Sequence, residues 1–96
     1  MAQLTLISPS TRPLRPLVEA ALDHEVRLLE TAIHRSEERL QTLEARYGLS
    51  SQEFLRRYEN DELEETLDLA EWVGEIRLLE RLQDKADALR EVQFAH

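Results

Sequence analysis

The sequence has no cysteine, two glycines and three prolines among its 96 residues. Without cysteine, a disulfide framework and a cysteine-ligated zinc site are both excluded. No apolar run approaches the roughly 18 residues that a membrane-spanning helix needs. The N-terminus lacks the cationic start and long apolar region of a secretory signal. We therefore expect a cytoplasmic protein that does not associate with a membrane.

Negative charge dominates the composition. Twelve Lys and Arg residues stand against 20 Asp and Glu residues, which gives a formal net charge of −8. A nucleic-acid-binding protein needs a basic face to displace counterions, so nucleic acid is not expected as a partner. The charge favours instead a basic protein partner. With 33% charged residues and few glycines, the chain is typical of a single helical domain.

No catalytic or metal-binding motif is evident. The chain has no cysteine nucleophile, no glycine-rich phosphate loop and no local serine–histidine–aspartate arrangement. His34 has Glu30 four residues before it and Glu38 four residues after it. However, the Glu-x-x-His spacing of carboxylate–histidine metal sites on helices does not occur, so exposed i, i+4 pairs are the favoured interpretation. We predict no enzymatic activity, no metal and no cofactor.

Two long segments with helical periodicity meet at residues 47–65, which we call the elbow. Gly48 fits the left-handed position just past a helix end. Ser50 fits a helix N-cap, and Glu53 stands three residues later, which is the spacing of a capping box. These signals predict a turn followed by a short helix at about residues 51–59.

The segment before the elbow predicts one long helix over about residues 14–47. Its apolar residues follow a heptad repeat for about four heptads, which is the pattern of a coiled-coil seam, and Ser36 is the one polar break. The seam comprises Leu22, Val26, Leu29, Ile33, Ser36, Leu40, Leu43 and Tyr47.

The segment after the elbow predicts a last helix over about residues 62–92, capped by Asn60 or Asp61. Gly74 lies in its middle at a cost of about 1 kcal/mol relative to alanine, which suggests a close neighbour there. Its apolar stripe comprises Leu63, Leu67, Ala70, Val73, Ile76, Leu79, Leu82, Ala86 and Leu89, which Leu69 and Trp72 widen.

Both long helices rise at the same rate, so antiparallel pairing across the elbow gives contact partners whose residue numbers sum to about 110. This register places Leu43 beside Leu67, Leu40 beside Ala70, and Ser36 opposite Gly74.

We therefore predict an all-α fold, a long antiparallel helical hairpin over residues 14–96 with a short connecting helix. Residues 1–13 would form an extended N-terminal arm or a frayed tail, with weak strand patterning at Leu4 and Leu6. Some apolar residues lie off the predicted seam, and the arm, a second copy or another protein would have to cover them. We favour a homodimer that completes a helical bundle. Its predicted interface is Leu14, Leu17, Ala21, Leu28 and Leu78.

Acidic residues crowd the second half of the elbow. Seven of them, and no basic residue, lie between Glu59 and Glu71. Such a run forms either a solvated face with charges at a helix start, or a docking surface for a basic protein. Aromatic and arginine side chains, the preferred anchors of protein interfaces, lie nearby. The candidate partner-binding residues are Phe54, Arg57, Tyr58, Glu62, Glu64, Glu65 and Trp72.

The same region resembles a segment of small helical prokaryotic proteins that accompany TumE-type toxins and are presumed antitoxins. The shared pattern is YG-(M/L)-S-x-x-E-F-x-x-R-Y-x-x-G-E-L, followed by D-x-x-E-W, and it covers about a third of the chain. The chain departs from it at Asp61, where glycine is expected, and this difference bears on the turn. The matching residues are Tyr47, Gly48, Leu49, Ser50, Glu53, Phe54, Arg57, Tyr58, Glu62, Leu63, Asp68, Glu71 and Trp72.

The resemblance implies a cytoplasmic protein that binds and blocks a basic, nuclease-like toxin. The alternative is a structural coiled-coil adaptor or self-assembling helical protein with no toxin partner. A small basic protein encoded by the adjacent gene would distinguish the first from the second.

Overall fold

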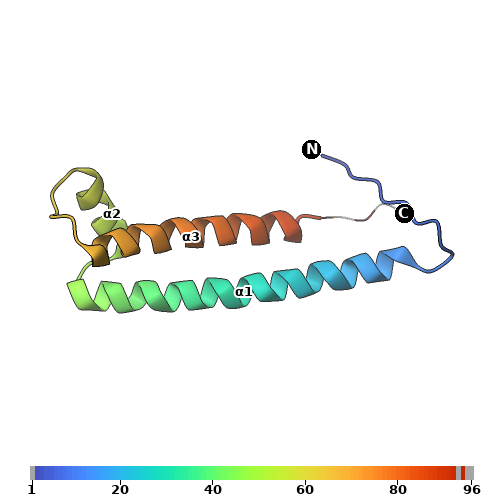
Figure 1. Ribbon diagram of the computed structural model, residues 1–96, viewed down its shortest axis with the longest axis horizontal. Coiled ribbons are helices and arrows are strands. Elements are labelled where there is room, and N and C mark those ends of the chain that lie inside the picture. Colours follow the sequence, from blue (N-terminus) through green and yellow to red (C-terminus); the bar gives the residue numbers. More distant parts are fainter. Residues whose placement is uncertain (1, 93, 95–96) are drawn as a thin grey trace.

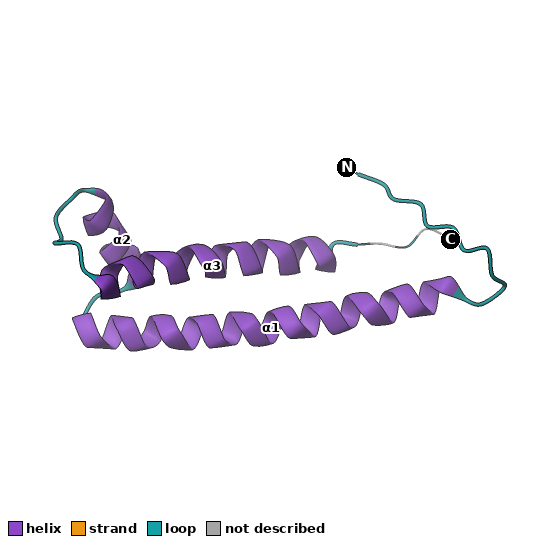
Figure 2. Cartoon of the chain, viewed as in Figure 1, coloured by secondary structure: helices purple, strands orange, loops and turns teal. Residues whose placement is uncertain are grey.

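A computed structural model of the chain describes residues 2–92 and 94. It contains three helices, α1 (Leu14–Tyr47), α2 (Ser51–Glu59) and α3 (Leu67–Arg90). The long helices α1 and α3 run antiparallel, and α2 lies at the end where the chain turns back (Figure 1). Residues 2–13 are an extended segment, and the described residues include no strand (Figure 2). The predicted all-α hairpin is confirmed.

The molecule is a rod of 61 × 25 × 18 Å. Its radius of gyration is 19.2 Å, whereas a compact chain of this length has about 12 to 13 Å. α1 has 34 residues and α3 has 24, so the start of α1 projects past the end of α3 (Figure 1). The buried apolar residues are correspondingly few, namely Leu29, Leu40, Phe54, Leu69, Trp72 and Ala86.

The helix-ending and helix-starting signals between α1 and α2 act as predicted. Gly48 adopts the left-handed conformation, with φ 64° and ψ 30°. The hydroxyl of Ser50 accepts a hydrogen bond of 3.1 Å from the N–H of Glu53. The carboxylate of Glu44 also accepts from the N–H of Ser51, at 2.7 Å, which satisfies a second N–H at the start of α2. The predicted bounds of the first two helices are confirmed.

The last helix begins at Leu67, five residues later than predicted. Asp61 takes the left-handed conformation with φ 55°. The N–H of Glu62 then bonds back to the carbonyl of Arg57 at 2.9 Å, which closes a Schellman motif at the end of α2. Thr66, and not Asn60 or Asp61, caps α3 with its side chain. The predicted start near residue 62 is therefore wrong, because the chain needs a loop to leave this motif.

The face that α3 buries near the elbow also differs from the prediction. Leu67 is 75% exposed and Ala70 is exposed, whereas Leu69 is 7% exposed and Trp72 has no exposed surface. The predicted pairings of Leu43 with Leu67 and of Leu40 with Ala70 are therefore wrong. Helix periodicity allowed either row of α3 to face α1, and packing of the large Trp72 ring selects its own row.

In the middle of the hairpin the predicted register is correct to about one residue. Ser36, which is fully buried, donates a hydrogen bond of 2.7 Å to the carboxylate of Glu75, the residue after Gly74. Arg39 binds the same carboxylate. Gly74 itself does not face Ser36, and a Cβ built on it meets no atom within 4 Å. The close neighbour expected at Gly74 is therefore not part of this chain's described residues.

Candidate protein-binding surface

A stacked aromatic core fixes the elbow. The rings of Phe54 and Trp72 are parallel within 4°, with centroids 3.9 Å apart, and Tyr47 packs on Trp72 at 5.6 Å. The indole N–H of Trp72 donates a hydrogen bond of 3.0 Å to the hydroxyl of Ser51. Because these contacts join all three helices, they hold α2 in one orientation on the hairpin.

This core changes the role of two predicted contact residues. Phe54 and Trp72 have no exposed surface, so a partner could touch either side chain only after this core had opened. Both side chains position the surface instead. Tyr58 packs on Phe54 at 5.6 Å and is only partly buried, so it is the predicted aromatic anchor that a partner can reach.

An ion-pair network holds the exposed side of α2. Glu53 accepts hydrogen bonds from Arg56 at 2.8 Å and from Arg57 at 3.0 Å. These two guanidinium groups lower the pKa of Glu53 to about 2. Arg56 also reaches Glu62 across the loop, at 3.3 Å. Arg57 and Glu62, both predicted partner-binding residues, are therefore engaged within the elbow.

Two more carboxylates are held by tyrosine hydroxyls. Tyr58 donates to Glu65 at 2.8 Å, which raises the pKa of the Tyr58 hydroxyl. Tyr47 donates to Asp68 at 2.7 Å, and together with Arg46 at 2.8 Å it lowers the pKa of the Asp68 carboxyl. These bonds tie the loop and the first turn of α3 to α2 and to the end of α1.

Three acidic residues in the elbow and the first turns of α3 remain open. Asp61, Glu64 and Glu71 are exposed, and they make no ion pair or side-chain hydrogen bond with the described residues. Of the predicted acidic residues, only Glu64 belongs to this set. Between Glu64 and Glu71 stands Leu67, which is 75% exposed.

Leu67 therefore lies on an outer face at the start of α3. Ala70 and Gly74 follow it at i+3 and i+7, so the three residues share one side of the helix, and all are exposed. We call Leu67, Ala70 and Gly74, with Glu64 and Glu71 beside them, the outer elbow face. Sequence analysis missed it because it assigned Leu67 and Ala70 to the hairpin seam. The feature of the sequence that points to the outer elbow face is Gly74, which lies in the middle of a helix and whose position has no close neighbour among the described residues.

The predicted oligomer interface lies toward the other end of the rod. Leu17 and Leu28 are 63% and 53% exposed, and Ala21 is exposed as well. Leu14 and Leu78 are partly buried. The hairpin therefore leaves most of this apolar set in contact with solvent.

Other kinds of site find little support in the described part of the chain. There, no three His, Asp or Glu side chains are placed to hold a metal ion. His34 pairs with Glu38 at 2.6 Å on an open surface. Within residues 2–92, no helix is long and apolar enough to span a membrane.

No protein family, curated protein or solved structure matches this chain.

Proposed function

We propose that this protein is an antitoxin-like binding module that docks a basic protein on its outer elbow face. The observation that carries the proposal is the 75% exposure of Leu67, with the exposed carboxylates of Glu64 three residues before it and Glu71 four residues after it in the sequence. A large apolar side chain in solvent forgoes about 1.5 to 3 kcal/mol of burial, which a partner surface can recover. The surrounding carboxylates select a basic partner.

The shape of the outer elbow face supports a protein as the occupant. Ala70 and Gly74 carry almost no side chain, so a partner's backbone or ring can approach the helix closely. Glycine in the middle of a helix costs about 1 kcal/mol relative to alanine. Among residues 2–92 and 94, no atom lies within 4 Å of a Cβ built on Gly74, so no packing there compensates for that cost. A partner that packed against the helix at Gly74 would compensate for this cost.

The rigidity of the elbow supports recognition without refolding. The Phe54–Trp72 stack and the hydrogen bond from Trp72 to Ser51 hold α2 on α3, and the Arg56–Glu62 ion pair joins α2 to the loop, before any partner arrives. A preorganised surface loses little conformational entropy on binding. Such a module would block a cytoplasmic toxin by covering its basic site.

Co-purification with the product of the adjacent gene tests this proposal. If that product is a small basic protein, we expect it to bind. We expect Leu67→Ala to weaken the complex about tenfold, since central anchors typically contribute more than 1 kcal/mol. Thr42→Ala, an exposed change on α1, is the matched control and should leave affinity unchanged. An adjacent product that shows no binding, or equal affinity for both variants, contradicts the proposal.

A further inference from the structure

The cluster of buried side chains lies in one half of the hairpin. This cluster comprises Leu40, Phe54, Leu69 and Trp72. The partly buried apolar side chains that pack on it lie between residues 43 and 79. We call residues 36–79 the elbow half of the hairpin, and we call residues 14–33 of α1 with residues 80–90 of α3 the distal half. α2 belongs to the elbow half (Figure 1), so the distal half consists of two helices side by side.

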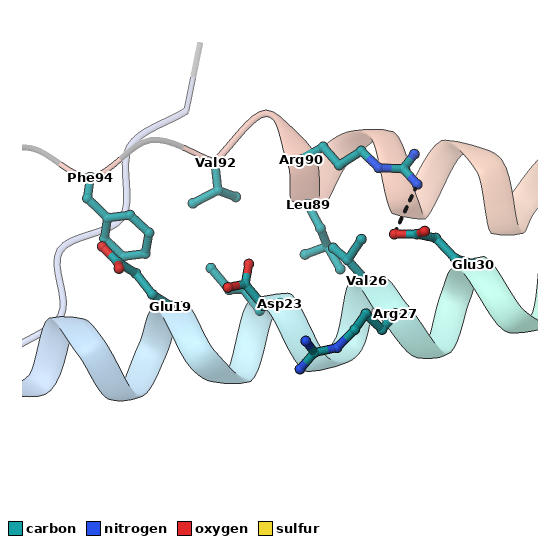
Figure 3. A pocket seen from close by; sticks show the side chains of 10 residues that line it. Glu19, Asp23, Val26, Arg27, Glu30, Leu89, Arg90, Val92 and Phe94 are labelled. Carbon is teal, nitrogen blue, oxygen red and sulfur yellow. Dashed lines mark ion pairs between the residues drawn. The ribbon is translucent and has the colours of Figure 1, made fainter.

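The distal half buries few side chains. Among its described residues, only Leu29, which is 5% exposed, and Ala86, which has no exposed surface, are buried. Two hollows lie between its helices, and one of them is lined in part by Leu22, Val26 and Leu89. Figure 3 shows Leu89 pointing toward α1 at this hollow. Apolar atoms that line a hollow lack contacts on one side, so they stabilise the hairpin less than the stacked rings at the elbow do.

The polar contacts between α1 and α3 differ in the same way. In the elbow half, the fully buried Ser36 donates its bond of 2.7 Å to Glu75, whose side chain is 13% exposed. Among the described residues of the distal half, the ion pairs that join the two helices are Lys85–Glu25 at 3.5 Å and Arg90–Glu30 at 3.6 Å. All four of these side chains are at least 42% exposed. Exposed ion pairs contribute little to stability, so they hold the distal half only weakly.

We propose that the distal half of the hairpin opens and closes as a separate unit while the elbow half stays folded. α1 runs through both halves without a break, so packing between the helices sets the boundary. Most of the stability of a protein helix comes from its tertiary packing, so residues 14–33 lose helical structure when α3 moves away. The Ser36–Glu75 bond lies next to the distal half and limits how far the opening extends.

The opening leaves the outer elbow face unchanged. Leu67 and Gly74 lie on the part of α3 that the Phe54–Trp72 stack holds against α2. Binding at this face, as proposed above, is therefore compatible with an open and with a closed distal half. The opening is a property of the free chain, so hydrogen exchange measures it without the proposed partner.

Hydrogen exchange of the full chain, followed residue by residue by NMR, tests the proposal. The amides near Leu29 and near Leu40 both lie in the interior of α1, so fraying at a helix end does not distinguish them. We expect the amides near Leu29 to exchange at least about tenfold faster than those near Leu40, after correction for their intrinsic rates. The amides near Leu82 in α3 should be as weakly protected as those near Leu29, because the two helices separate together. Equal protection near Leu29 and near Leu40 overturns the proposal.

Two matched variants show whether the halves open separately. Leu29→Val and Leu40→Val make the same small change at buried leucines of α1, which are 5% and 7% exposed. Leu40 stays packed when the distal half alone opens. Leu40→Val should therefore speed exchange in the elbow half and leave exchange in the distal half within about twofold of the wild type. Leu29→Val should speed exchange in both halves, because full unfolding also loses the packing of Leu29.

The contrary result is equally specific. If Leu40→Val speeds exchange by the same factor in both halves, the hairpin opens as one unit and the proposal fails. The wild-type comparison of the amides near Leu29 and near Leu40 decides the question even if a variant does not fold.

Discussion

Ser36 and Glu75 lie 39 residues apart in the chain and share a hydrogen bond of 2.7 Å in the middle of the hairpin. The Ser36 side chain is fully buried, so its hydroxyl would lose its hydrogen bonds to water without this partner. The guanidinium of Arg39 binds the same carboxylate and lowers the pKa of Glu75. Because only one register brings these residues together, the polar break in the α1 seam specifies how the helices align.

We expect Ser36→Ala to destabilise the hairpin by about 1 kcal/mol, the typical contribution of such a hydrogen bond. Urea unfolding followed by circular dichroism measures this change. Thr42→Ala is the control, because the Thr42 hydroxyl is exposed and bonds only within its own helix, to the carbonyl of Glu38 at 3.1 Å. Equal stability of the two variants would show that the Ser36–Glu75 bond contributes nothing.

Asp61→Gly should stabilise the chain. Asp61 has φ 55°, and a left-handed conformation costs residues with a side chain roughly 1 to 2 kcal/mol, less for aspartate. We expect a gain of about 0.5 kcal/mol in thermal or urea unfolding after allowing for the flexibility of glycine. Asn60→Gly is the control. Because Asn60 has φ −94°, which a residue with a side chain adopts without strain, glycine at this position should destabilise the protein. A loss of stability with Asp61→Gly would be inconsistent with strain at this turn.

Local signals made the first two helices predictable. Gly48 and Ser50 specify the turn through their own backbone and side chain, without help from the rest of the fold. The start of α3 was missed because a run of acidic residues is typical of a helix N-terminus. The departure of Asp61 from the resembled pattern correctly pointed to the turn, since the position is left-handed.

Which face α3 buries was harder to predict, because its apolar stripe is wide enough to offer two rows. Leu67 fits the period of the seam as well as Leu69 does. The choice depends on how Trp72 stacks on Phe54, a contact between residues that sequence spacing does not relate. The exposed Leu67, and with it the outer elbow face, follows from that long-range packing.

The elbow should be less stable in acid than at neutral pH. The pKa of Glu53 lies at about 2 instead of its ordinary value of 4.5, because the guanidinium groups of Arg56 and Arg57 donate hydrogen bonds to its carboxylate. A lowered pKa contributes stability above the unfolded value, and this is lost as the pH falls from about 4.5 to about 2. The lowered pKa values of Asp68 and Glu75 act in the same direction. NMR titration of the Glu53 carboxyl checks this. A Glu53 that titrates at its ordinary value in the folded chain contradicts the network.

Phe54→Ala should cost about 3 to 5 kcal/mol, because it removes a fully buried ring and leaves a cavity against Trp72. The one tryptophan of the chain reports this change directly. The fluorescence emission of Trp72 should shift to the red as the elbow opens, even if circular dichroism shows that the helices remain folded. Leu67→Ala, the exposed control, should alter stability by less than about 0.5 kcal/mol. An unshifted emission from Phe54→Ala would mean that Trp72 does not depend on α2.

The rate of association with the basic protein from the adjacent gene tests the central claim most directly. The elbow variant carries Glu64→Lys and Glu71→Lys, and the control carries Asp23→Lys and Glu37→Lys on α1. All four positions are exposed and without ion pairs to the described residues, and both variants change the net charge equally. Electrostatic steering falls with salt. We therefore predict that the elbow variant associates several-fold more slowly with a flatter salt dependence, while the control stays near the wild type. Equal rates and salt slopes for the two variants would contradict docking at the elbow.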